Sequence, residues 1–150
     1  MSKLHGKAAF GLEPDAPPIA QESSLALLQI VALVSLVDGF NLPVSVATQG
    51  GSSECKTSSC AANVNVACLA ELQVKGPDGS VLACKSACIA FNQPQYCCTG
   101  AFNTPQTCPP TNYSKIFEDQ CPQANSYAYD DQNSTFTCSG GPNYVITFYP

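Results

Sequence analysis

The pattern of apolar and polar residues sets the first 37 residues apart from the rest of the chain. Residues 1–22 mix prolines, acids and small residues without a helical or strand period, which indicates an unstructured start. Residues 25–37 are apolar except for Gln29 and Ser35, a run shorter than the ~20 residues of a transmembrane helix. Such a run is typical of a signal-peptide core or a buried segment. Acids and prolines separate it from the basic residues near the start, so the pattern predicts no convincing signal peptide.

Two later stretches show the alternation expected of strands. The run VSLVDGFNLPVSV at 34–46 places β-branched residues around an Asp-Gly pair, which predicts a strand, a turn and a second strand. The tail STFTCSGGPNYVITFYP at 134–150 alternates on both sides of a Gly-Gly-Pro turn, which predicts a β-hairpin.

Short helices are predicted in the loop-rich middle of the chain. The stretches CKSACIAF at 84–91 and TNYSKIFEDQC at 111–121 are the candidates. In the second stretch we expect Ile116 and Phe117 to pack inward. Glu118, with the aspartate that follows it, is expected on a solvated face.

The charge composition excludes one large class of function. The 150 residues carry a net charge of −5, and only 11% of them are charged. The six basic residues are all lysines, so no arginine-containing basic patch is available for a nucleic acid. The length suits one domain with a modest core. We expect an extracellular protein with neutral or cationic partners.

Ten cysteines are the strongest compositional signal. Their number is even, and cytosolic proteins rarely carry so many. A zinc site is the alternative, but there is no repeated Cys-x2-4-Cys knuckle, and the only histidine, His5, lies outside the cluster. Disulfides are therefore expected, with no metal and no cofactor. Spacing alone leaves their pairing open, because ten cysteines admit on the order of a thousand arrangements.

Two glycosylation sequons agree with an oxidising compartment. They begin at Asn112 and Asn133, and each has the Asn-x-Ser/Thr form. Such triplets also arise by chance, so both sites are expectations.

The order of cysteines and the sequence between them resemble a known family. The segments SLVDGFNLPVSV, SECKTSSCAANVN, ACKSACIAFNQPQYCCTG, NTPQTCPPTNYSKIFEDQCPQA, YAYDDQNSTFTC and GGPNYVITF closely resemble the thaumatin-like or osmotin-like pathogenesis-related proteins of plants. The resemblance covers 34–150, which we expect to be the domain, preceded by a leader at 1–33 that does not match.

The resemblance implies an all-β fold: a partial thaumatin-type β-sandwich that carries a disulfide-rich lobe of loops and short helices at 68–108. It also implies that every cysteine is paired. The implied pairs are Cys55–Cys138, Cys60–Cys121, Cys68–Cys84, Cys88–Cys97 and Cys98–Cys108.

Departures from the family point to an amino-terminally truncated member. Typical members are longer and carry more cysteines. Their last cysteine bonds the first, and here Tyr149 stands in that last position. The unmatched leader is interpreted as a misassigned first exon, or as a substitute for a lost strand.

The family's site is an acidic cleft between the sandwich and the disulfide-rich lobe. Asp38 and Asp130 match two of its acids, with Asp131 beside the second. The family's arginine, glutamate and another aspartate have no counterpart, and Leu33 takes the place of that aspartate. The alternative for Asp38 is an ordinary Asp-Gly turn. For the two neighbouring aspartates it is a solvated loop.

The resemblance implies a secreted defence protein, in the apoplast or vacuole, that binds β-1,3-glucan or another fungal cell-wall polysaccharide or perturbs membranes. A monomer is expected. An alternative is residual endo-β-1,3-glucanase activity, which needs two suitably spaced carboxyl groups. The family's presumed acid is missing, so hydrolysis is not expected. A further alternative is a non-functional fragment that exposes a sheet edge and aggregates.

Overall fold

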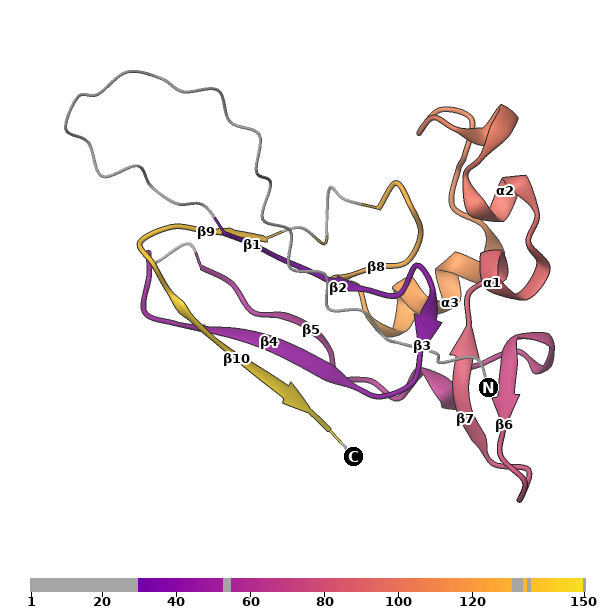
Figure 1. Cartoon of the computed structure of the whole chain (residues 1–150), viewed down its shortest axis with the longest axis horizontal. Coiled ribbons are helices and arrows are strands. Elements are labelled where there is room, and N and C mark those ends of the chain that lie inside the picture. The colour runs from indigo at the N-terminus through magenta and orange to yellow at the C-terminus, as the bar shows by residue number, and fades with distance from the viewer. Residues whose placement is uncertain (1–29, 53–54, 131–133, 135, 150) are drawn as a thin grey trace.

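The computed structural model describes residues 30–52, 55–130, 134 and 136–149. Most strands lie at one end of the molecule, and the short helices gather at the other end beside β3, β6 and β7 (Figure 1). The strands are β1 (Ile30–Ala32), β2 (Val34–Ser35), β3 (Gly39–Phe40), β4 (Val44–Gln49), β5 (Ser58–Cys60), β6 (Gln73–Lys75), β7 (Val81–Lys85), β8 (Ala124–Asn125), β9 (Phe136–Cys138) and β10 (Asn143–Phe148). The helices are α1 (Ala87–Phe91), α2 (Pro94–Cys97) and α3 (Asn112–Gln120), with 3-10 turns η1 (Val64–Val66), η2 (Ala70–Leu72) and η3 (Gly100–Phe102).

The strands form small sheets whose neighbours are distant in sequence. Two sheets have three strands, in the orders β10-β4-β5 and β3-β7-β6, and both are antiparallel. Two more are strand pairs: β1 with β9 is antiparallel, and β2 with β8 is parallel. Strand β1 lies near the end of the predicted leader at 1–33. This part of the leader therefore pairs through its backbone with β9. With these short helices, the fold is mixed rather than clearly all-β.

The predicted hairpin at the tail is wrong. Strand β9 pairs with β1, whereas β10 pairs with β4 in the register Asn143↔Gln49 to Phe148↔Val44. Gly140 and Gly141, which lie between the two strands, both have positive φ, 84° and 63°. The segment that contains them connects β9 in one sheet to β10 in another. Alternation identified the strands but contains no information on their partners.

The predicted turn at Asp38-Gly39 separates strands of different sheets, since β2 pairs with β8 and β3 pairs with β7. Gly39 has φ 130°, and a Cβ there would lie 2.4 Å from the carbonyl oxygen of Cys84. A side chain at this position would therefore force β3 away from β7.

The core joins the sheets to the disulfide-rich lobe. Buried apolar side chains from several strands, from η1 and η2, and from α3 form one cluster: Val34, Leu36, Phe40, Val46, Val64, Leu72, Phe117 and Ala124. Two disulfides, Cys60–Cys121 and Cys68–Cys84, have both cysteines in this cluster. The structure contains the same five pairs that the resemblance implies. The bridges therefore supplement a small apolar core.

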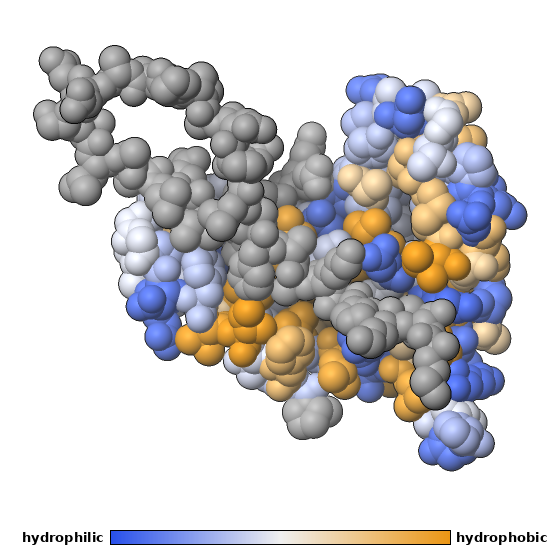
Figure 2. Space-filling model, viewed as in Figure 1, coloured by the Kyte–Doolittle hydropathy of each residue, from blue (hydrophilic) through white to orange (hydrophobic). Residues whose placement is uncertain are grey.

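The sheet of β10 and β4 exposes apolar surface. Val145, Ile146 and Phe148 on β10 are all exposed. Figure 2 shows apolar residues at the surface in the region of this sheet. Within the described ranges, no helix has the length and apolar character needed to cross a membrane.

Helix α3 fits its prediction closely, while the first predicted helix is shorter. Cys84 and Lys85 belong to β7, and α1 begins after Ser86, whose side chain accepts a hydrogen bond from the Ile89 backbone N–H. Helix α3 begins after Thr111. The Thr111 hydroxyl accepts from the backbone N–H of Ser114, and the Ser114 hydroxyl accepts from the backbone N–H of Thr111.

We predict that Thr111→Ala lowers the free energy of unfolding by about 1 kcal/mol, because it removes the acceptor that caps the first turn of α3. Urea unfolding measures this change. Gln120→Ala, at the exposed last residue of the same helix, is the control and should change stability by less than about 0.5 kcal/mol. Equal losses in the two variants would contradict the capping role.

Candidate functional site

An open cavity of about 250 Å³ lies between α3 and the loop that follows β8. Helix α3 and the proline before its cap form one wall, and the loop forms the other. The lining residues are Pro110, Ser114, Lys115, Glu118, Ser126, Tyr127 and Asp130. Two carboxyl groups, two serine hydroxyls, an amine and a phenol ring thus surround one small space.

Asp130 is held in place by its own loop. Its Oδ2 atom accepts hydrogen bonds from both the backbone N–H and the hydroxyl of Ser126, each 2.8 Å long. Its backbone N–H donates to the carbonyl of Tyr127 at 3.3 Å, and its carbonyl accepts from the hydroxyl of buried Ser134. These contacts fix the carboxylate at the cavity wall, so this aspartate is not simply part of a solvated loop.

Glu118 is the residue that the sequence prediction misplaced. It was expected to face water, but it is half-buried, and its Oε2 atom is buried without a hydrogen-bond partner in the described structure. The reason is helical spacing: Glu118 lies four residues after buried Ser114, so both side chains lie over the same face of α3. The spacing can be read from the sequence, but the burial of Ser114 cannot, because it depends on the fold.

The pKa of Glu118 is raised above the ordinary glutamate value. Burial is the largest cause, because it disfavours the charged carboxylate. The charge of Asp130, a hydrogen bond with Asp130 and the charge of Asp119 raise this pKa further. Glu118 therefore holds a proton at a higher pH than an exposed glutamate does.

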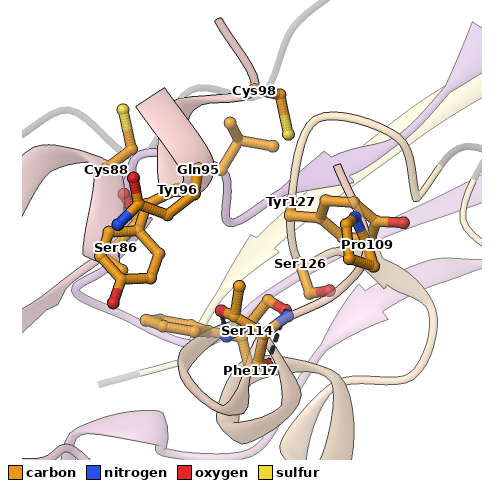
Figure 3. Close-up of a pocket in the computed structure, with 13 residues that line it drawn as sticks. Ser86, Cys88, Gln95, Tyr96, Cys98, Pro109, Ser114, Phe117, Ser126 and Tyr127 are labelled. Atoms are coloured by element: carbon orange, nitrogen blue, oxygen red, sulfur yellow. Dashed lines mark hydrogen bonds between the residues drawn. The ribbon is translucent and has the colours of Figure 1, made fainter. Parts of the chain in front are cut away.

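A second, smaller pocket of about 20 Å³ adjoins the cavity and shares Ser114, Ser126 and Tyr127 with it. Figure 3 shows Gln95 and Tyr96 of α2 across from the loop residues, with Phe117 of α3 at another side. Its volume is that of about one water molecule. The disulfide-rich lobe and the β8 loop therefore meet closely here and support the wall of the larger cavity.

The other predicted site residues lie apart from this cavity or outside the described residues. Asp38 is exposed, its carbonyl accepts from the backbone N–H of Ser86 at 3.2 Å, and it is absent from the lining that the structure describes. Asn112 is exposed at the first residue of α3. Asp131 and Asn133 lie outside the described residues. The cleft assignment of Asp38 and the glycosylation sites stay predictions.

No metal centre is evident in the described part of the chain, where no three or more His, Cys, Asp or Glu side chains are grouped to hold an ion. The cavity can bind a ligand through hydrogen bonds. The Asp130 carboxylate accepts, the Glu118 carboxyl donates when it is protonated, and the serine hydroxyls do both. Such groups suit a neutral, hydroxyl-rich ligand.

Comparison with known proteins agrees with this chemistry. The family model described as "Thaumatin family" matches residues 19–150. The chain is 76% identical over 117 residues to "Thaumatin-like protein 1" of Castanea sativa, and these cover 78% of this chain and 48% of the relative. It is 69% identical over 117 residues to a protein of Prunus avium named "Glucan endo-1,3-beta-glucosidase", with the same coverage.

A more distant relative carries a defence name. "Pathogenesis-related thaumatin-like protein 3.5" of Cryptomeria japonica is 55% identical over 117 residues, 78% of this chain and 48% of the relative. The chain thus spans about half the length of these relatives.

Proposed function

Because this chain belongs to the thaumatin family, we propose that it is a secreted plant defence protein that binds β-1,3-glucan of fungal cell walls. The observation that carries the proposal is the cavity whose wall holds Asp130 in a fixed position beside Glu118. The name of the Prunus avium relative supports glucan as the ligand. The five disulfides support an extracellular site of action.

The size and lining of the cavity suit one sugar unit. Pockets for drug-sized ligands span roughly 300–1,000 Å³, so a cavity of about 250 Å³ takes part of a polysaccharide. Sugar hydroxyls both donate and accept hydrogen bonds. The Asp130 carboxylate accepts from them, and the ring of half-buried Tyr127 offers an apolar face for stacking. Asp38 would contact the chain farther along the surface.

Hydrolysis of the glucan is the second candidate, favoured by the name of the Prunus avium relative. Retaining glycosidases hold their two carboxyl groups about 5–5.5 Å apart, and inverting ones about 6.5–9.5 Å apart. Glu118 and Asp130 both line the cavity, but the glutamate that the resemblance names as the presumed acid has no counterpart in this chain. We therefore propose binding without cleavage. Release of reducing sugar from laminarin, together with binding, would favour the enzyme.

We predict that Asp130→Asn weakens binding to insoluble β-1,3-glucan by about tenfold or more, because a hydrogen bond to a charged acceptor contributes about 1.5–3 kcal/mol. A pull-down at several glucan concentrations measures the affinity. The matched control is Asp119→Asn, which removes an exposed carboxylate of α3 that does not line the cavity. Wild-type protein that stays in the supernatant at all concentrations would exclude glucan binding.

A further inference from the structure

The Glu118 carboxyl occupies an environment that a second negative charge does not suit. Its Oε2 atom is buried and, in the described structure, lacks a hydrogen-bond partner. The neighbouring Asp130 carboxylate is already fixed as an acceptor by Ser126. Two carboxylates side by side repel, whereas a single proton between them makes a hydrogen bond. A neutral Glu118 therefore gives both groups a satisfied contact.

We propose that Glu118 is a positioning residue of the glucan site, which in its neutral form donates a hydrogen bond to Asp130 and holds the cavity wall in the shape that accepts sugar. This inference rests on the proposed function and adds the condition under which the site works. When Glu118 loses its proton, repulsion separates the two carboxyl groups and the wall changes shape. Glucan binding should then be strongest in acidic solution.

Among the described residues, the charged groups near the pair fit this direction or oppose it weakly. On α3, Asp119 adds negative charge and favours the protonated form of Glu118. Lys115, on the same helix, lines the cavity and would favour the ionised form, but its side chain is exposed and its charge is screened by solvent. From the loop after β8, the charge of Asp130 favours protonation of Glu118.

The sign of the pH dependence follows from the raised pKa of Glu118. The folded protein holds this proton more tightly than the unfolded chain does. Folded stability from this group is therefore fully present below the ordinary glutamate pKa, and it is lost as the pH rises through the raised pKa. Glucan affinity should decline over the same interval.

The test compares three proteins on insoluble β-1,3-glucan at about pH 4, below the ordinary glutamate pKa, and at about pH 7.5, well above it. For the wild type we expect affinity to fall by about tenfold at the higher pH, which corresponds to the loss of one charge-assisted hydrogen bond. Glu118→Gln keeps a donor at every pH, so its affinity should stay near the acidic wild-type value. Asp119→Asn should keep most of the wild-type decline.

The possible outcomes distinguish the role of Glu118 from the proposed glucan binding. A wild type that binds equally at both pH values, or a Glu118→Gln variant that keeps the full decline, overturns the role of Glu118 and leaves glucan binding in place. Failure of all three proteins to bind at either pH overturns the proposed function.

Thermal unfolding without glucan gives an independent readout of the shared proton. Glu118→Gln should raise the melting temperature relative to the wild type at about pH 7.5 and not at about pH 4. An equal difference in melting temperature at both pH values would contradict the proposal that Glu118 and Asp130 share a proton.

Discussion

Replacing Cys60 and Cys121 together with serine will lower the free energy of unfolding by about 4 kcal/mol, the loop-closure value for a bridge of this span. The two cysteines are 61 residues apart, so their bond restricts the unfolded chain strongly. They are 1% and 2% exposed and link β5 to the end of α3. The double change is preferable to Cys60→Ser alone, which leaves Cys121 as a free thiol that can exchange with other bridges.

The matched control removes a shorter, less buried bridge. Cys88 and Cys97 are nine residues apart and half-buried, and their replacement by serine should cost about 3 kcal/mol. Burying two hydroxyls in the core adds to the cost at Cys60 and Cys121. Urea unfolding under non-oxidising, non-reducing conditions measures both variants. Equal transition midpoints would contradict the view that the long bridge stabilises the fold most.

The size of this effect bears on the fragment alternative. The free energy of unfolding of a small domain is only about 5–15 kcal/mol. The loss of this bridge would therefore remove a large part of the stability. The exposed apolar side chains of β10 then become a route to aggregation. A wild type that unfolds cooperatively, while the Cys60/Cys121 variant aggregates, would show that the chain folds as it stands and depends on this bridge.

The sequence predicted local elements better than their partners. Helix α3 carries a capping threonine and an apolar pair on one side, so both its limits and its buried residue, Phe117, could be predicted. The strands of the tail could also be recognised by their alternation. Their partners could not, because β9 and β10 pair with strands near the start of the described chain, about a hundred residues away.

The candidate site was half visible in the sequence. Asp130 came from the resemblance, and the hydrogen bonds from Ser126 that fix it are local. Glu118 was missed because two adjacent acids at the end of a helix usually face solvent. Only the position of the β8 loop against α3 makes one of them half-buried, and that position depends on long-range packing and on the Cys60–Cys121 bridge.

The second large effect is expected at the centre of α3. We predict that Phe117→Ala lowers the free energy of unfolding by about 3–5 kcal/mol, the range for truncating a buried aromatic side chain. Phe117 is 1% exposed and belongs to the core cluster. It also lines the small pocket beside the cavity, so its loss would enlarge a space that has the volume of about one water molecule. Lys115→Ala, at an exposed position on the same helix, should change stability by less than about 0.5 kcal/mol.

Phe117 also determines where Glu118 lies, because the two are consecutive and the buried ring fixes the rotation of the helix about its axis. Phe117→Leu keeps an apolar side chain in the core and should fold with a smaller loss of stability. In this variant the melting temperature and the glucan affinity should fall together at acidic and at neutral pH. Glu118→Gln should instead change only the pH profile. If Phe117→Leu lowers stability and leaves glucan affinity at its wild-type value, the packing of α3 does not position the site.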